Sequence, residues 1–154
     1  MEQENTTQYF NKVPPHDAEA EQAVLSSMFI DREAVSVAME VLKGDDFYRP
    51  DNRAVFEAAL ELFAKGEPID IITVKNRLEE KGIFEQVGGI GYISQIASSV
   101  GSSVNIRNYA KIVKDKAVLR TLIKTTGEIT QQCYDGKESI NHILDNAEQG
   151  IFNI

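Results

Sequence analysis

The sequence predicts an all-α fold, in which a small globular body of about five helices is followed by an antiparallel helical hairpin. Three observations support this prediction. Apolar residues recur at helical spacing along nearly the whole chain after Asp17. Residues that favour helix N-caps precede these stretches, and glycines follow most of them. Between Asn105 and Tyr134 there is no proline and only one glycine, Gly127, which is typical of one long helix.

The first helices are marked by their capping residues. The two prolines at positions 14 and 15 end any earlier structure, and we interpret residues 1–12 as a disordered tail. We expect Asp17 to cap a helix that extends to Ile30, with Glu19 and Glu21 placing negative charge at its start. Asp31 then begins a second helix that ends near Gly44.

Two further helices are predicted in the middle of the chain. We expect Asp51 to cap the third helix, which Gly66 ends. Residues 69–74 are rich in β-branched side chains and would suit a strand, but no second strand candidate exists to pair with it. Asp70 as an N-cap and Gly82 as a stop therefore favour a fourth helix.

The last part of the sequence predicts the hairpin. A turn at Gly88-Gly89 precedes a short fifth helix, and the long helix follows from about Asn105. Ser139 is expected to cap a final helix of about a dozen residues, which is too short to cover its partner. We therefore expect residues 13–103 to form the globular body and residues 104–154 the hairpin, with the uncovered apolar stripe packed against another chain.

Composition and motifs exclude several classes of function. No apolar run reaches the roughly 20 residues that cross a bilayer, and the polar N-terminus is not a secretory signal. The single cysteine, Cys133, fits a reducing, cytoplasmic environment. No phosphate-binding loop and no catalytic constellation is present, and His16, His142 and Cys133 are too scattered for a metal site. We therefore expect no catalytic, nucleotide-binding or metal-binding residue and no cofactor in this chain.

A basic constellation lies on the predicted long helix, although the net charge of −8 argues against a main nucleic-acid-binding surface. Its functional interpretation is contact with DNA or with an acidic partner, and the alternative is a solvated or ion-paired helix face. Six residues form two rows along this helix: Arg107, Lys111 and Lys114, and Lys116, Arg120 and Lys124.

Several separate segments carry a family resemblance. They are Pro14-Pro15-His16-Asp17 with residues 19–25, Asp46-Phe47-Tyr48-Arg49-Pro50, residues 66–70 with Thr73-Val74, Val87-Gly88-Gly89 with Tyr92, and Asn105-Ile106 with Tyr109, residues 112–113, Lys116 and residues 119–120. In this order they resemble the N-terminal domain of bacterial replicative DNA helicases of the DnaB type, over residues 13–151. One departure is Asn52, where the family often has histidine.

The resemblance implies a collar and assembly domain that belongs to a longer helicase, which unwinds duplex DNA at the replication fork. Such helicases continue into a RecA-like motor domain that binds ATP, magnesium and most of the DNA. In the family, hairpins pair between subunits, often as a trimer of dimers within the hexamer. The collar face receives the C-terminal domain of primase and, in some cases, a helicase loader.

The resemblance also suggests residue roles. Glu19 and Tyr92 are candidates for contact with primase, with helix capping and core packing as their alternatives. The residues expected in the seam between subunits, some of which could instead belong to the intrachain core, are Ile106, Tyr109, Val113, Ile140, Ile143, Leu144 and Ala147.

Two other functions compete with this interpretation. The basic rows would suit an independent nucleic-acid-binding helical domain. The helicase-binding domain at the C-terminus of a primase has a similar architecture, but the segment from Pro14 to Asp17 near the chain start argues against it.

Overall fold

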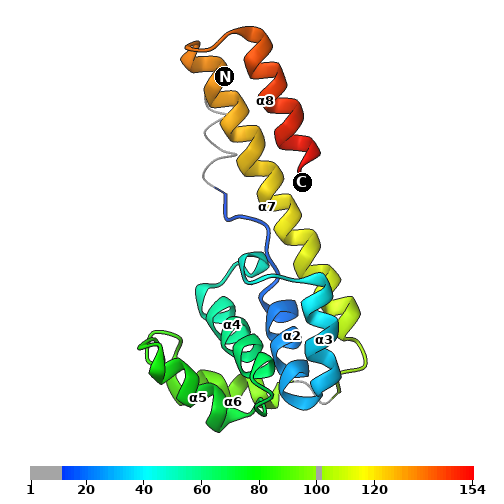
Figure 1. Cartoon of the computed structure of the whole chain (residues 1–154), viewed down its shortest axis with the longest axis vertical. Helices are drawn as coiled ribbons and strands as arrows, with labels where there is room; N and C mark the ends of the chain where they lie inside the picture. The colour runs from blue at the N-terminus through cyan, green and yellow to red at the C-terminus, as the bar shows by residue number, and fades with distance from the viewer. Residues whose placement is uncertain (1–11, 100–101) are drawn as a thin grey trace. The chain divides into compact units, whose positions relative to one another are not determined.

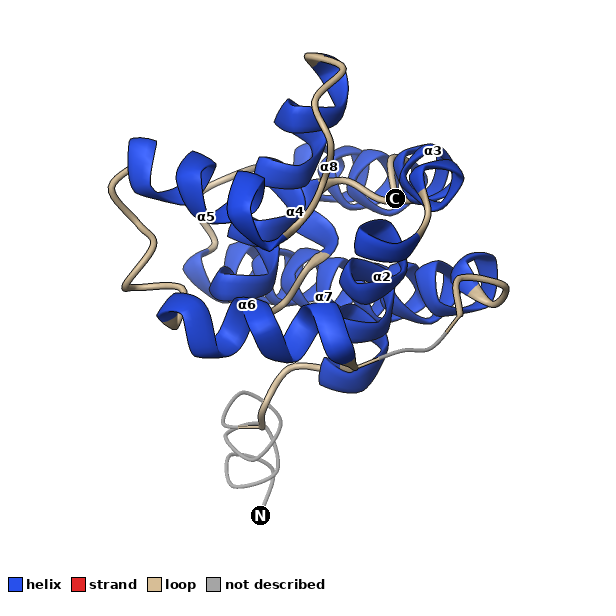
Figure 2. Cartoon of the chain, turned by 90° about the horizontal axis from the view of Figure 1, so that it is seen from below, coloured by secondary structure: helices blue, strands red, loops and turns tan. Residues whose placement is uncertain are grey.

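The computed structural model describes residues 12–99 and 102–154. All the regular secondary structure in this part of the chain is helical (Figure 1, Figure 2). No strand occurs among these described residues, so the all-α prediction is confirmed and residues 69–74 do not form a strand. The predicted tail lies outside the described residues apart from Lys12. The elements are α2 (Ala18–Ile30), α3 (Arg32–Val41), the short 3-10 helix η1 (Gly44–Asp46), α4 (Pro50–Ala64), α5 (Ile71–Glu80), α6 (Gly89–Ser98), α7 (Ile106–Asp135) and α8 (Ile140–Phe152).

The chain divides into two compact units. Residues Asp17–Ala117 form the first, which we call the body, and Val118–Ile154 together with the chain up to His16 form the second, which we call the hairpin unit. The sequence suggested a boundary between residues 103 and 104. The body instead extends into α7, because one face of its first turns is buried: Ile106, Ala110, Val113 and Ala117.

The core of the body is built around α2. This helix packs against α3, α4 and α6, and α5 packs against α4 and α6. Buried residues therefore lie on several sides of α2, including Ala20, Val24, Leu25 and Met28. A helix surrounded in this way is buried on most of its sides, and its buried residues include the polar Glu21, Ser26 and Ser27.

The capping residues behave largely as the sequence predicts. The side chains of Asp17, Asp31 and Asp70 each accept a hydrogen bond from a backbone N–H of the following turn at 2.9 Å. The Ser139 side chain accepts one at 3.2 Å. Asp51 is the exception, because α4 begins at Pro50 with Arg49 in the N-cap position, so Asp51 lies inside the first turn. Proline suits the first position of a helix, where its missing N–H has no intrahelical role.

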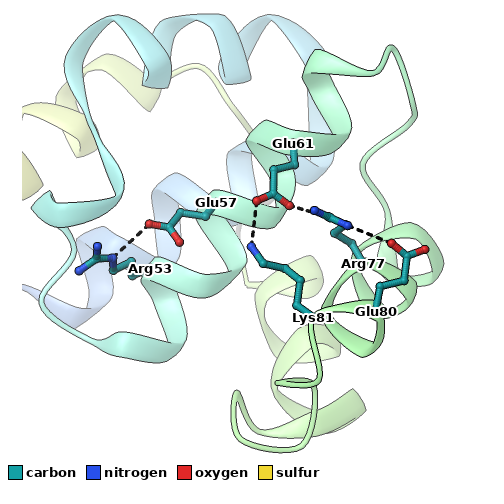
Figure 3. Close-up of polar contacts among 6 residues, drawn as sticks. All are labelled: Arg53, Glu57, Glu61, Arg77, Glu80 and Lys81. Carbon is teal, nitrogen blue, oxygen red and sulfur yellow. Dashed lines mark hydrogen bonds and ion pairs between the residues drawn. The ribbon is translucent and has the colours of Figure 1, made fainter.

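An ion network joins α4 to α5 (Figure 3). Glu61 on α4 accepts a hydrogen bond from Nε of Arg77 at 2.5 Å and one from Nζ of Lys81 at 2.9 Å. Arg77 also binds Glu80 at 3.0 Å. Burial by itself would raise the pKa of Glu61, but the hydrogen bonds from Lys81 and Arg77 outweigh it and lower this pKa. The carboxylate therefore favours the folded state when it is ionised.

In the hairpin unit, α8 runs antiparallel beside the later turns of α7, as Figure 1 shows. The two helices approach closely at Gly150, where an added Cβ would lie 3.0 Å from the methyl carbon of Thr125. On the N-terminal segment of the same unit, Nη1 of Arg120 donates a hydrogen bond to the carbonyl oxygen of Pro15 at 2.9 Å. These contacts hold the elements of this unit together.

The substitution Glu61→Gln is expected to lower the free energy of unfolding by less than about 1 kcal/mol at neutral pH, because it removes a partly exposed charge held by two cations. A carboxyl whose pKa is lowered by folding stabilises the protein above its ordinary pKa near 4.3, and this contribution is lost as the pH falls through the lowered value. Denaturant titrations at pH 7 and near pH 3 measure the difference.

The matched control is Glu57→Gln, which lies on the same helix and loses only an exposed pair with Arg53 within α4. We expect no measurable change for this variant. Equal losses in the two variants, or a Glu61→Gln effect that persists at low pH, would contradict the assigned role of the network.

Candidate functional site

A buried carboxylate joins α2 to the link before α4. Glu21 is 1% exposed. Its oxygens accept hydrogen bonds from the backbone N–H groups of Tyr48 at 2.9 Å and Arg49 at 3.3 Å. They also accept one from the side-chain amide of Asn52 at 3.0 Å. A buried carboxyl group is costly unless hydrogen bonds satisfy its oxygens, so these donors compensate for the burial of Glu21 and fix the backbone of the link.

The network continues from Asn52 to α6. The amide oxygen of Asn52, which is itself 1% exposed, accepts a hydrogen bond from the hydroxyl of Tyr92. Partial burial raises the pKa of Tyr92 to about 12, with further increases from the negative charges of Asp51 and Glu21 and a decrease from Arg49. The Tyr92 hydroxyl is therefore neutral at physiological pH and acts as the hydrogen-bond donor to the buried amide oxygen of Asn52.

Arg49 completes this arrangement at the surface. Its guanidinium lies over the ring of Tyr92, with 5.8 Å between Cζ and the ring centroid. The same group binds both carboxylate oxygens of Asp51, at 3.1 and 2.7 Å. Hydrogen bonding to Asp51 and its negative charge raise the pKa of Arg49. An arginine stacked on a tyrosine is a combination that is common at protein-binding surfaces.

Gly88 allows Tyr92 to occupy its place. Its φ is 114°, in the region that favours glycine, and an added Cβ would lie 2.8 Å from Cβ of Tyr92. The turn that the sequence predicts at Gly88-Gly89 therefore has a second role beyond starting α6. Any side chain at residue 88 would displace the tyrosine from Asn52.

The two residues suggested for primase contact have different environments. Glu19 is exposed in the first turn of α2, and Tyr92 is partly buried on α6. These helices pack against each other. The sequence did not indicate Glu21, Asn52 or Arg49 as members of the site. For Glu21 a signal was available, because it precedes Val24 and Leu25 by one helical turn and so shares their buried face.

A second surface lies on the hairpin unit, where large apolar side chains are exposed. On α7, Leu119 and Ile123 lie four residues apart, which places them on one stripe. On α8, Ile140 (76% exposed), Leu144 (61%) and Ile151 (44%) are also spaced at helical intervals, and Phe152 (87%) is exposed at the end of the helix. Contiguous exposed apolar residues of this kind are typical of interaction surfaces.

The residues suggested for the seam between subunits fall into two groups. Ile106 and Val113 are buried in the core of the body, and Tyr109 packs against that core. For these three residues the structure therefore supports the intrachain alternative. On α8, Ile143 and Ala147 are partly buried, and Ile140 and Leu144 are exposed. Only this second group remains available for contact with another chain.

Much of the basic constellation is engaged within the chain. Arg107 pairs with Glu40 at 3.6 Å, Lys111 with Asp115 at 2.8 Å, and Lys114 with Asp46 at 3.2 Å. In the second row, Arg120 binds the Pro15 carbonyl, and Lys124 is exposed while Lys116 is partly exposed. The six residues therefore do not act as one uniform cationic face.

Other kinds of site find little support in the described residues. No group of three or more potential metal ligands occurs among them, and Cys133 is an exposed free thiol. His16 lies with its Nδ1 atom 2.8 Å from the carbonyl oxygen of Pro14. None of the helices in this part of the chain is long and apolar enough to span a membrane.

Comparison with protein families shows which family the chain belongs to. The model of the DnaB-like helicase N-terminal domain matches residues 13–115, which include the complete Glu21–Asn52–Tyr92 network. The chain belongs to this family. The family resemblance noted from the sequence segments is therefore confirmed.

Curated relatives extend the match beyond the body. The chain is 42% identical over 144 residues to the replicative DNA helicase DnaC of Bacillus subtilis (strain 168), and this alignment covers 94% of the chain. It is 38% identical over 146 residues to the replicative DNA helicase DnaB of Geobacillus stearothermophilus, covering 95%. In both cases the chain spans 32% of the relative, which is about a third of its length.

Solved structures share the fold. The N-terminal domain of DnaB helicase from Mycobacterium tuberculosis matches with a TM-score of 0.88 and 35% identity, covering 92% of this chain and 100% of that one. The corresponding domain from Helicobacter pylori matches with a TM-score of 0.63 and 25% identity, covering 75% and 90%. The Helicobacter pylori structure is described together with its interactions with primase.

The raised pKa of Tyr92 gives a spectroscopic prediction. In the folded chain, one tyrosine is expected to ionise with a pKa near 12. Tyr92→Phe should remove this late component from an absorbance titration of the phenolate. Since folding raises this pKa, the stabilisation is complete below the ordinary tyrosine pKa near 10 and is lost as the pH rises towards 12. A late component that persists in Tyr92→Phe would show that the hydroxyl is placed incorrectly.

Proposed function

We propose that the chain is the N-terminal collar and assembly domain of a replicative DNA helicase, and that it pairs with copies of itself and docks primase. The observation that carries this proposal is the match over the entire length of a solved DnaB N-terminal domain. Unwinding of DNA, together with ATP and magnesium binding, is assigned in this proposal to a motor domain of the longer protein. The chain itself contributes assembly and partner binding.

Self-association is proposed for the apolar surface of the hairpin unit. The stripes on α7 and α8 consist of Leu119 and Ile123 and of Ile140, Leu144 and Ile151. Because two hairpins can bury such stripes against each other as a four-helix arrangement, a second copy is the partner whose chemistry fits. The contact is isologous, with the same stripes contributed by both copies.

The substitution Leu144→Glu tests this contact. Burying a leucine contributes about 2 kcal/mol, and both copies of an isologous dimer carry the substitution, so about 4 kcal/mol is lost in addition to the cost of placing charges in the seam. The dimer dissociation constant should therefore increase on the order of 1,000-fold or more. Sedimentation equilibrium measures this constant. Gln149→Glu is the matched control, since it adds the same charge at another exposed position of α8 and should leave the dimer intact.

Two results would contradict the proposed self-association. One is a wild-type chain that stays monomeric at the highest concentration reached. The other is an equal weakening by Leu144→Glu and Gln149→Glu, which would indicate a general charge effect.

Docking of the C-terminal domain of primase is proposed for the body surface near Glu19 and Tyr92. The support is the exposed carboxylate of Glu19, the stacked pair of Arg49 and Tyr92, and the primase interaction described for the Helicobacter pylori domain. Arginine and tyrosine are enriched among the residues that dominate binding energy at interfaces. The overall negative charge of the chain is also consistent with a protein partner.

Light scattering on mixtures of the chain with the cognate primase C-terminal domain should give a complex of defined stoichiometry. Glu19→Ala is expected to raise the dissociation constant of this complex about tenfold, which is typical of a charged contact residue. Glu33→Ala is the matched control, because Glu33 is also exposed in the first turn of its helix. An unchanged affinity in both Glu19→Ala and Tyr92→Ala would remove these residues from the docking surface.

Direct binding of nucleic acid is the weaker candidate. Three of the six basic residues form ion pairs within the chain, and a fourth binds a backbone carbonyl. Ion pairing lowers the number of cations available to replace counterions on phosphates. Salt-dependent binding of single-stranded DNA by the chain alone would favour this function over the assembly domain.

A further inference from the structure

The hydroxyl of Tyr92 is directed into the body and not towards a partner. It donates to the amide oxygen of Asn52, which is 1% exposed, and the Asn52 amide group donates in turn to Glu21 at 3.0 Å. What Tyr92 can offer to a docked protein is therefore its ring. The position of that ring depends on the asparagine behind it.

Glu21 holds both members of the stacked pair. It reaches Arg49 directly, through the backbone N–H at 3.3 Å, and it reaches Tyr92 through Asn52. The guanidinium of Arg49 then lies over the ring at 5.8 Å. The buried carboxylate thus fixes the backbone of Arg49 and, through Asn52, the hydroxyl of Tyr92, while Asp51 holds the Arg49 guanidinium at 3.1 and 2.7 Å. The ring and the guanidinium are therefore each tied to a carboxylate before any partner arrives.

We infer that Asn52 is a positioning residue for the partner-docking surface, and that it acts by fixing the ring of Tyr92 under Arg49. This inference rests on the proposed docking function. Asn52 cannot contact a partner itself, because it is buried. It serves docking by keeping the ring in its bound arrangement, which removes the entropic cost of ordering a mobile side chain on binding.

The chemistry of Asn52 is suited to this role. Its amide supplies one donor for the Glu21 carboxylate and one acceptor for the Tyr92 hydroxyl. Leucine at this position retains a similar volume but supplies neither group. A neutral histidine retains one donor and one acceptor, and so it can connect the same two partners.

Dissociation constants for the primase C-terminal domain, measured by calorimetry at pH 8, test the inference with four variants of the whole chain. Asn52→Leu and Tyr92→Phe should each weaken binding about three- to tenfold, as expected for a side chain that must be ordered on binding. The double variant should bind no more weakly than Asn52→Leu alone, because both substitutions break the same connection. Asn52→His should bind within about twofold of the wild-type chain, since neutral imidazole restores both hydrogen bonds.

The outcomes separate the possible roles of these residues. Additive losses in the double variant would mean that the Tyr92 hydroxyl contacts the partner directly, and they would overturn the inference while leaving the docking function intact. An unchanged affinity in Asn52→Leu would overturn it as well. Failure of the wild-type chain to bind primase would overturn both the docking function and the inference.

The variants Asn52→His and Tyr92→Phe distinguish a loss of affinity caused by misfolding from one caused by a misplaced ring. Phenylalanine at residue 92 keeps the ring and its packing, so this variant retains the fold. If Asn52→His has the free energy of unfolding of the wild-type chain but still binds primase as weakly as Asn52→Leu, the positioning role is wrong.

Discussion

The body depends on the hydrogen bonds of one buried carboxyl group. Glu21 lies on α2, the helix around which the others pack, at a place where a charge without partners would be costly. Its hydrogen bonds extend to a link that has no regular structure at Tyr48 and Arg49, to α4 through Asn52, and from there to α6. Removing any one donor leaves the buried carboxyl oxygens less satisfied, so these elements are constrained together.

The sequence predicts the helices well because their signals are local. Caps such as Asp17 and Asp70 act within one turn, and glycine stops act through the backbone of a single residue. The exception, Asp51, arises because two local signals compete. A proline directly before it begins α4 one residue earlier, and the carboxylate binds Arg49 instead of capping the helix.

The candidate site was harder to predict because its connections are distant in sequence. Asn52 follows Glu21 by 31 positions and precedes Tyr92 by 40. Nothing local in the sequence shows that these residues meet. The same limit applies to α7, where helical spacing identifies apolar stripes but not their partners. The sequence therefore left Val113 as a candidate for either the seam or the intrachain core, and in the structure it is buried in the core of the body.

Gly150 lies where α8 approaches α7 closely, and it affects the exposed surface that the two helices form. An added Cβ at this residue would lie 3.0 Å from the methyl carbon of Thr125, so the absence of a side chain lets α8 approach α7 closely there. The distance between helix axes depends on the side chains at the contact, over a range of about 8–10 Å. A side chain at residue 150 would be expected to push α8 away from α7, so a residue that belongs to neither exposed stripe constrains the spacing between the two stripes.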